Sequence, residues 1–107
     1  MTNPVAEIRM QPDGEFYMND VCTALLFGVS AESLKFQIGK HGRGAMALTP
    51  LMRQSGIRRR KHYEAIAGSE EVDVIDLLKY YARLDGVELV LRSSEGVVHK
   101  LVSRTAS

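Results

Sequence analysis

Helix-capping residues and glycines alternate through the middle of this sequence and limit it to a series of short helices. Asn, Ser and Thr side chains accept hydrogen bonds from the free N–H groups at a helix start, and proline fits the first helical position. Glycine readily adopts the left-handed conformation that ends a helix. Together with the apolar spacing, these signals predict five helices: Asn19 to Phe27, Ser30 to Ile38, Thr49 to Ser55, Arg58 to Ala67 and Val72 to Leu84.

Both ends of the sequence carry the pattern of a β-hairpin. Val5 to Met10 and Glu15 to Met18 flank a Pro-Asp-Gly turn, and Val87 to Leu91 and Val97 to Val102 flank a second turn. We therefore expect a mainly α fold in one domain over residues 1–107. It would comprise an N-terminal hairpin (1–18), a helical core (19–85) and a C-terminal hairpin (86–103).

The length and composition are typical of a small domain. A chain of 107 residues can bury one core, and no apolar run approaches the roughly 18 residues that a membrane span needs. The first ten residues contain charged side chains where a secretory signal would be apolar, so we expect a cytoplasmic protein. The single cysteine, Cys22, lies in an apolar stretch and is expected in the core. His41, His62 and His99 are too widely separated to predict a metal site, and we expect no cofactor.

Charge is segregated along the sequence. Between Glu32 and Glu64 there is no acidic residue, although the whole chain has a formal net charge of only +1. Such a segment predicts a basic surface for a polyanion, most commonly nucleic acid, and the alternative is a solvated surface without a ligand. The segment holds eight of the fourteen Lys and Arg residues: Lys35, Lys40, Arg43, Arg53, Arg58, Arg59, Arg60 and Lys61.

Two segments have the pattern of a helix–turn–helix, in which a glycine at the turn lets a second helix project into the DNA major groove. In residues 20–38, Ala24 is the small residue of the first helix and Gly28 lies at the turn. Val29 follows the turn, and Leu34 is the buried residue of the second helix. In residues 48–68 the comparable residues are Met52, Gly56, Ile57 and Ile66. The first segment has the better apolar pattern and the second the higher positive charge, so either could read DNA.

Two family resemblances favour the same class of protein. The segments LMRQSGI (51–57), YEAIAG (63–68) and DLLKYYARLDGVELVL (76–91) resemble the lambda-repressor-like helix–turn–helix regulators, above all the antitoxin-type members of addiction modules. That resemblance implies that Arg58 to Tyr63 form the exposed half of the recognition helix. Phe16 to Val21 and Gly28 to Ser30, with Leu34, are similar to the short motif of excisionase and mercury-regulator-type proteins.

The residue pattern does not predict an enzyme, because no nucleophile, base and orienting residue occur together. Asp73 and Asp76 lie one helical turn apart beside Lys79 and Arg83, as expected of solvated ion partners. We therefore expect a sequence-specific DNA-binding transcriptional regulator, either a repressor or an antitoxin-type autoregulator, built as a five-helix helix–turn–helix domain. Its partners would be double-stranded DNA and, as a further candidate, a toxin or other protein.

The basic segment supplies the expected DNA contacts. Phosphates would be bound by Lys35, Lys40, Arg43, Arg53 and some of Arg58 to Lys61, and base edges by one or two of Arg58, Arg59, Arg60 and His62. Arg59 and Arg60 are expected to be exposed and to contribute little to folding. A homodimer held by the terminal hairpins is expected, because one helix reads few base pairs. The alternatives are a phage- or plasmid-encoded interaction module on the same scaffold and an RNA-binding protein.

Overall fold

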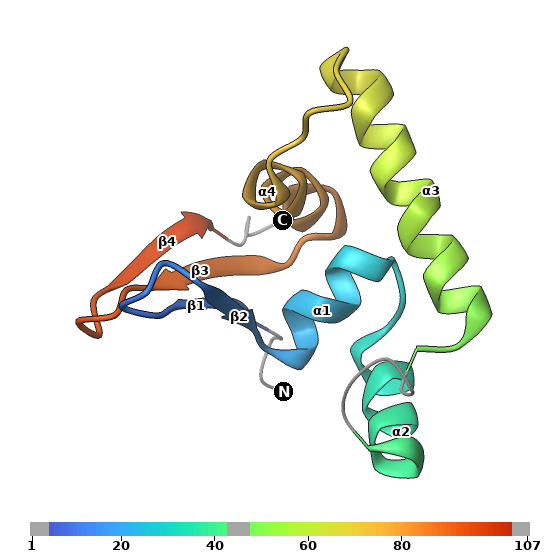
Figure 1. Ribbon diagram of the computed structural model, residues 1–107, viewed down its shortest axis with the longest axis horizontal. Coiled ribbons are helices and arrows are strands. Elements are labelled where there is room, and N and C mark those ends of the chain that lie inside the picture. Colours follow the sequence, from blue (N-terminus) through green and yellow to red (C-terminus); the bar gives the residue numbers. More distant parts are fainter. Residues whose placement is uncertain (1–4, 43–47, 104–107) are drawn as a thin grey trace.

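The computed structural model describes residues 5–42 and 48–103, which form an α/β fold of four helices and a four-stranded sheet (Figure 1). The elements are β1 (Val5–Met10), β2 (Phe16–Met18), α1 (Asp20–Phe27), α2 (Ala31–His41), α3 (Pro50–Ala67), α4 (Val74–Asp85), β3 (Glu88–Arg92) and β4 (Val98–Val102). The expectation of a mainly α fold with five helices and two flanking hairpins is therefore wrong.

The two terminal hairpins pair with each other and form one mixed sheet in the order β2-β1-β3-β4. Strands within each hairpin are antiparallel, whereas β1 and β3 are parallel, with Val5 opposite Glu88 and Ile8 opposite Leu91. Parallel neighbours need a long crossover connection, which the four helices between them supply. Each hairpin was predicted separately, but their pairing was not.

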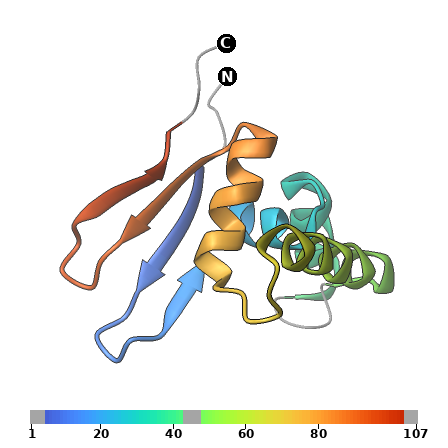
Figure 2. The ribbon, with the colours of Figure 1, turned by 90° about the horizontal axis from the view of Figure 1, so that it is seen from above.

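The sheet lies on one side of the molecule and the helices on the other (Figure 2). Side chains alternate across the sheet, so Ala6, Ile8 and Leu89 are fully buried. On the opposite face, the carboxylate of Glu7 pairs with the guanidinium of Arg92 at 3.1 Å. One face is therefore packed against the helices, whereas the other carries charged side chains and, among them, Val90, which is 8% exposed.

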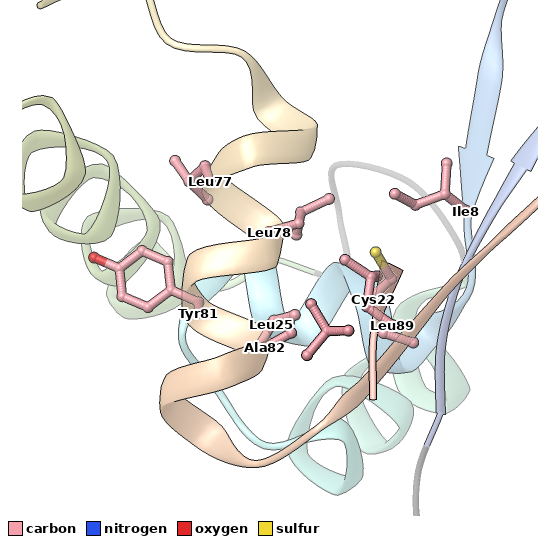
Figure 3. Packing of buried hydrophobic residues seen from close by; sticks show 10 residues of the cluster. Ile8, Cys22, Leu25, Leu77, Leu78, Tyr81, Ala82 and Leu89 are labelled. Atoms are coloured by element: carbon pink, nitrogen blue, oxygen red, sulfur yellow. The ribbon is translucent and has the colours of Figure 1, made fainter. Parts of the chain in front are cut away.

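The hydrophobic core lies between the sheet and helices α1 and α4 (Figure 3). The amphipathic helix predicted near residues 72–84 is α4, which buries Leu77, Leu78 and Tyr81. Cys22 of α1 is fully buried, so its prediction as a core residue is confirmed. Burial raises the pKa of the Cys22 thiol from 9.0 to about 12, because the apolar surroundings disfavour the thiolate.

Helix α3 is continuous over 18 residues, although Gly56 was expected to end a shorter helix. Its start was predicted correctly, since the Thr49 hydroxyl accepts a hydrogen bond from the Met52 N–H at 3.2 Å. Gly56 lies inside this helix. A side chain would not fit at this position, because a Cβ there would come within 2.6 Å of Cδ1 of Phe27 in α1. This glycine therefore allows two helices to approach closely, and the predicted fourth helix is the second half of α3.

The pairing of the hairpins removes the argument that they hold a dimer together. Of the strand residues that a second copy was expected to cover, Leu89 is fully buried and Val102 is only 6% exposed within one subunit. Val97 and Val98 remain about half exposed, at 51% and 48%. The apolar surface of the sheet is thus covered mainly by the subunit's own helices.

In residues 5–42 and 48–103, no single helix is long and apolar enough to cross a membrane. Helices α1 and α2 reach the required length and composition only when taken together, and the chain bends sharply between them.

Candidate nucleic-acid interface

Helices α1 and α2 have the geometry of a helix–turn–helix. The chain bends by 110° between them, within the range of about 90–120° that is typical of this motif. Gly28 ends α1 in the left-handed conformation, with φ 69° and ψ 34°. The Ser30 hydroxyl then accepts a hydrogen bond from the Ser33 N–H at 3.1 Å and caps the start of α2. The turn therefore occupies residues 28–30.

The buried positions of this motif agree with the pattern read from residues 20–38. Ala24 is only 3% exposed and Leu34 only 2% exposed. The Val29 N–H donates to the Ala24 carbonyl at 3.0 Å, which fixes the chain as it leaves α1. Asn19 anchors the other end of α1 to the sheet, because its side-chain oxygen accepts from the Cys22 N–H at 2.9 Å and its amide donates to the Val5 carbonyl at 2.9 Å.

Residues 48–68 contain no turn and are not a second helix–turn–helix. Met52 is buried as expected, but Ile57 and Ile66 are 55% and 51% exposed. The residues Arg58 to Tyr63 therefore lie in the middle of one long helix. The recognition helix that the repressor-like resemblance implies, preceded by a turn at Gly56, is absent from this segment.

The exposed surface of α2 carries a stripe of side chains suited to a DNA groove. Ser33, Phe36, Gln37 and Lys40 follow the spacing i, i+3, i+4, i+7, which places them along one side of the helix. Phe36 is 67% exposed, Ser33 and Lys40 are exposed, and Gln37 is half-buried. The DNA contacts expected from sequence included Lys35 and Lys40 but not Phe36, although this spacing marks Phe36 as a neighbour of Ser33 and Lys40.

The predicted DNA-binding cations are not gathered on one face. Lys35 and Lys40 are exposed on α2, whereas Arg43 lies outside the described residues. On α3, the neighbouring residues Arg58, Lys61 and His62 are exposed. Arg53 and Arg60, two helical turns apart, instead line an apolar groove beside α1 and α4. The basic segment thus supplies several separate surfaces.

Arg59 is a structural residue, contrary to our expectation that it contacts DNA and contributes little to folding. Its guanidinium donates to the Leu25 carbonyl at 2.8 Å and pairs with the Asp85 carboxylate at 3.1 Å. It also lies 4.3 Å from the centre of the Tyr81 ring, whose hydroxyl donates back to the Arg59 carbonyl at 2.8 Å. Arg59 therefore joins α3 to the end of α1 and to α4.

A signal for this role was present in the sequence. Met52, Gly56, Arg59 and Tyr63 recur at helical spacing along α3, and they lie on the side of the helix that faces the rest of the protein. Reading the four consecutive basic residues as one exposed DNA-binding group concealed that periodicity.

In the described part of the chain, no group of three His, Cys, Asp or Glu side chains is placed to hold a metal ion. No protein-family model, curated protein or solved structure matches this chain.

Proposed function

We propose that this protein binds double-stranded DNA and uses α2 as its recognition helix. The observation that carries the proposal is the 110° bend between α1 and α2 across a left-handed glycine, which leaves the stripe of α2 exposed. In the helix–turn–helix docking mode, the residues near the start of the second helix contact base edges in the major groove. A protein that occupies an operator in this way acts as a transcriptional repressor, and that is the biological role we propose.

The side chains of the stripe suggest a division of labour. Ser33 and Gln37 can exchange hydrogen bonds with base edges, and the exposed ring of Phe36 can contact a thymine methyl group. Lys40 continues the stripe, and Lys35 lies beside it, so their ammonium groups are suited to phosphates on the two sides of the groove. Arg58 and Lys61 on α3 add a sequence-independent attraction.

This assignment differs from the recognition helix expected from sequence. Arg59 has its guanidinium committed to Leu25, Asp85 and Tyr81, so it is not free for a base edge. The second half of α3 also has no turn before it that could project it away from the domain. The available cations of α3 are therefore proposed as phosphate-binding groups only.

The test begins with selection of preferred sites from a random duplex library, followed by fluorescence anisotropy over a series of salt concentrations. Affinity should fall steeply with salt, because phosphate neutralisation releases counterions. Phe36→Ala should weaken binding to the selected site by about 1–3 kcal/mol and change the preferred base at one position. Tyr17→Ala is the matched control, since Tyr17 is an aromatic residue 61% exposed on β2, away from the stripe.

The proposal also predicts a contrast between helices. Arg58→Ala should weaken binding to selected and random duplexes by the same factor, whereas Ser33→Ala should change the base preference. If Arg58→Ala changes the preferred sequence and the α2 variants do not, α3 is the reading helix and the proposal is wrong. Absence of any salt-dependent binding would exclude DNA as the ligand.

A further inference from the structure

Two arginines are neighbours on the outer face of the sheet, near the end where both hairpins turn. Figure 2 shows the two hairpin turns at one end of the sheet. Arg9 of β1 is the register partner of Arg92 of β3, and residues opposite each other on neighbouring strands project from the same face. Because like charges directly opposite each other destabilise a sheet, this pair requires an anion.

The protein itself supplies one carboxylate for the two guanidinium groups. Glu7 approaches Nη2 of Arg9 with Oε2 at 3.4 Å and Nε of Arg92 with Oε1 at 3.1 Å. Within residues 5–42 and 48–103, no other acidic side chain pairs with either arginine. The group therefore keeps a net positive charge, and each planar guanidinium has further N–H donors for a second anion.

Both arginines line one open hollow between the hairpin turns. Its volume of about 450 Å³ lies within the range of roughly 300–1,000 Å³ that is usual for small-molecule sites. The rest of its lining is neutral, and Gln11, Ser93 and Ser94 add side chains that can form hydrogen bonds. The acidic residues of the two turns are exposed and are not part of this lining: Asp13, Glu15 and Glu95.

We propose that Arg9 and Arg92 bind a phosphate group in this hollow, either as free phosphate or as a small phosphate monoester. A monoester carries a charge of about −1.5 to −2 and three acceptor oxygens at pH 7, so it can accept hydrogen bonds from both guanidinium groups at once. The planar fork of arginine also matches the spacing of phosphate oxygens. A second carboxylate would bring less charge and one oxygen fewer.

The hollow is separate from the surface proposed for DNA. It is formed by the two hairpins alone and uses no residue of α2 or α3. An opening confined to two hairpin ends suits one phosphate group rather than the row of phosphates along a duplex. The proposal is therefore independent of DNA binding.

A neighbouring aromatic residue separates the two sources of the phosphate group. Tyr17 of β2 is the register partner of Arg9 on its other side, and it is 61% exposed. A second hollow of about 280 Å³ reaches this ring and adjoins the first, since both are lined by Arg9 and Gln11. A nucleotide whose phosphate lies at the arginines can stack its base on Tyr17, whereas free phosphate makes no use of the ring.

Backbone amide NMR spectra recorded during titration at constant ionic strength test the site. The probes are inorganic phosphate, adenosine monophosphate and, as the control that lacks phosphate, adenosine. The two phosphate-containing probes should shift the signals of Gln11, Ser94 and Gly96, which line the hollow, and adenosine should not.

Arg9→Gln and Arg92→Gln should each raise the Kd for both phosphate-containing probes at least about tenfold, because each removes charged hydrogen bonds to the ligand. The matched control is Lys100→Gln. It removes a cation from the same face of the sheet, where Lys100 pairs with Glu88 at 3.0 Å, but Lys100 does not line the hollow. This variant should leave the Kd nearly unchanged.

Glu7→Gln should have the opposite effect. It removes the carboxylate that competes for both guanidinium groups, so phosphate and adenosine monophosphate should bind several times more tightly than to the wild-type protein. A substitution that merely disturbed the sheet would weaken binding, so the gain in affinity also shows that this variant folds.

Three results would overturn the proposal. One is the absence of any shift with phosphate or adenosine monophosphate at millimolar concentration. Another is a Kd for the Arg9 and Arg92 variants equal to that of Lys100→Gln, and the third is a Glu7→Gln variant that binds no more tightly than the wild-type protein. Equal affinity for the two phosphate-containing probes identifies the phosphate group alone as the ligand, whereas tighter binding of adenosine monophosphate that Tyr17→Ala abolishes identifies a nucleotide.

Discussion

Replacement of Arg59 by alanine should destabilise the fold strongly, although Arg59 lies in a run of four basic residues. The charged hydrogen bond to the Leu25 carbonyl, 2.8 Å long, is worth about 1.5–3 kcal/mol. The contact with the Tyr81 ring at 4.3 Å adds about 0.5–2 kcal/mol. The ion pair with Asp85 is partly exposed and adds about 0–1 kcal/mol.

These contributions share one side chain and are not additive, so we expect the free energy of unfolding to fall by about 3 kcal/mol. For a domain of this size the corresponding loss in Tm is about 10–25 °C. Urea unfolding followed by circular dichroism measures the change directly. The matched control is Arg58→Ala, which removes the neighbouring exposed arginine and should change the free energy of unfolding by less than about 0.5 kcal/mol. Equal stability of the two variants would refute the structural role of Arg59.

Three other experiments test the packing around this residue and the core. Gly28→Ala should lower the free energy of unfolding more than Gly86→Ala in the same urea assay. Both glycines have φ near +70°, but a Cβ at Gly28 would lie 2.5 Å from Nε of Arg59, whereas the space at Gly86 is open. Equal losses of stability in the two variants would contradict this contact. Tyr81→Phe should lower the free energy of unfolding by about 1 kcal/mol, because it removes the hydroxyl that donates to the Arg59 carbonyl, and an unchanged urea midpoint would argue against that bond. Above pH 9.0 the Cys22 thiol ionises in the unfolded chain but stays protonated in the folded one up to about pH 12, so stability should fall as pH rises through this range. Urea unfolding of Cys22→Ala over the same pH series should lack the loss of stability that ionisation of the thiol causes. A pH dependence identical to that of the wild-type protein would exclude this effect of Cys22.

Local features of the fold could be predicted from sequence, whereas contacts between distant segments could not. The caps at Asn19, Ser30 and Thr49 were recognised because a capping side chain acts on its own helix. The role of Gly56 was misread, since its missing Cβ accommodates Phe27 of another helix and such an approach leaves no local pattern. The parallel pairing of β1 with β3 was missed for the same reason.

At the candidate site, too, local features could be predicted from sequence but contacts between distant segments could not. The turn at Gly28 was predicted from its missing Cβ and the burial of Leu34 from the apolar pattern, and both agree with the structure. Charge alone favoured the second half of α3, because four consecutive basic residues suggest one surface. The structure turns Arg59 inward and Arg60 toward the groove, and leaves Arg58 and Lys61 exposed. Four basic residues in succession along the sequence therefore lie in different surroundings in the fold.

The parallel pairing of β1 with β3 has a consequence for how the chain folds during synthesis. Strand β1 leaves the ribosome long before β3, its partner at the centre of the sheet. Until β3 emerges, β1 has only β2 beside it, and an isolated two-stranded hairpin is marginally stable. Pairing between segments so far apart in sequence also slows folding, because a large loop must close first. Strand β1 therefore lacks its neighbour β3, and Ala6 and Ile8 lack the cover of α4, until most of the chain has been made, and in that interval the open edge of β1 is available to chaperones or to aggregation.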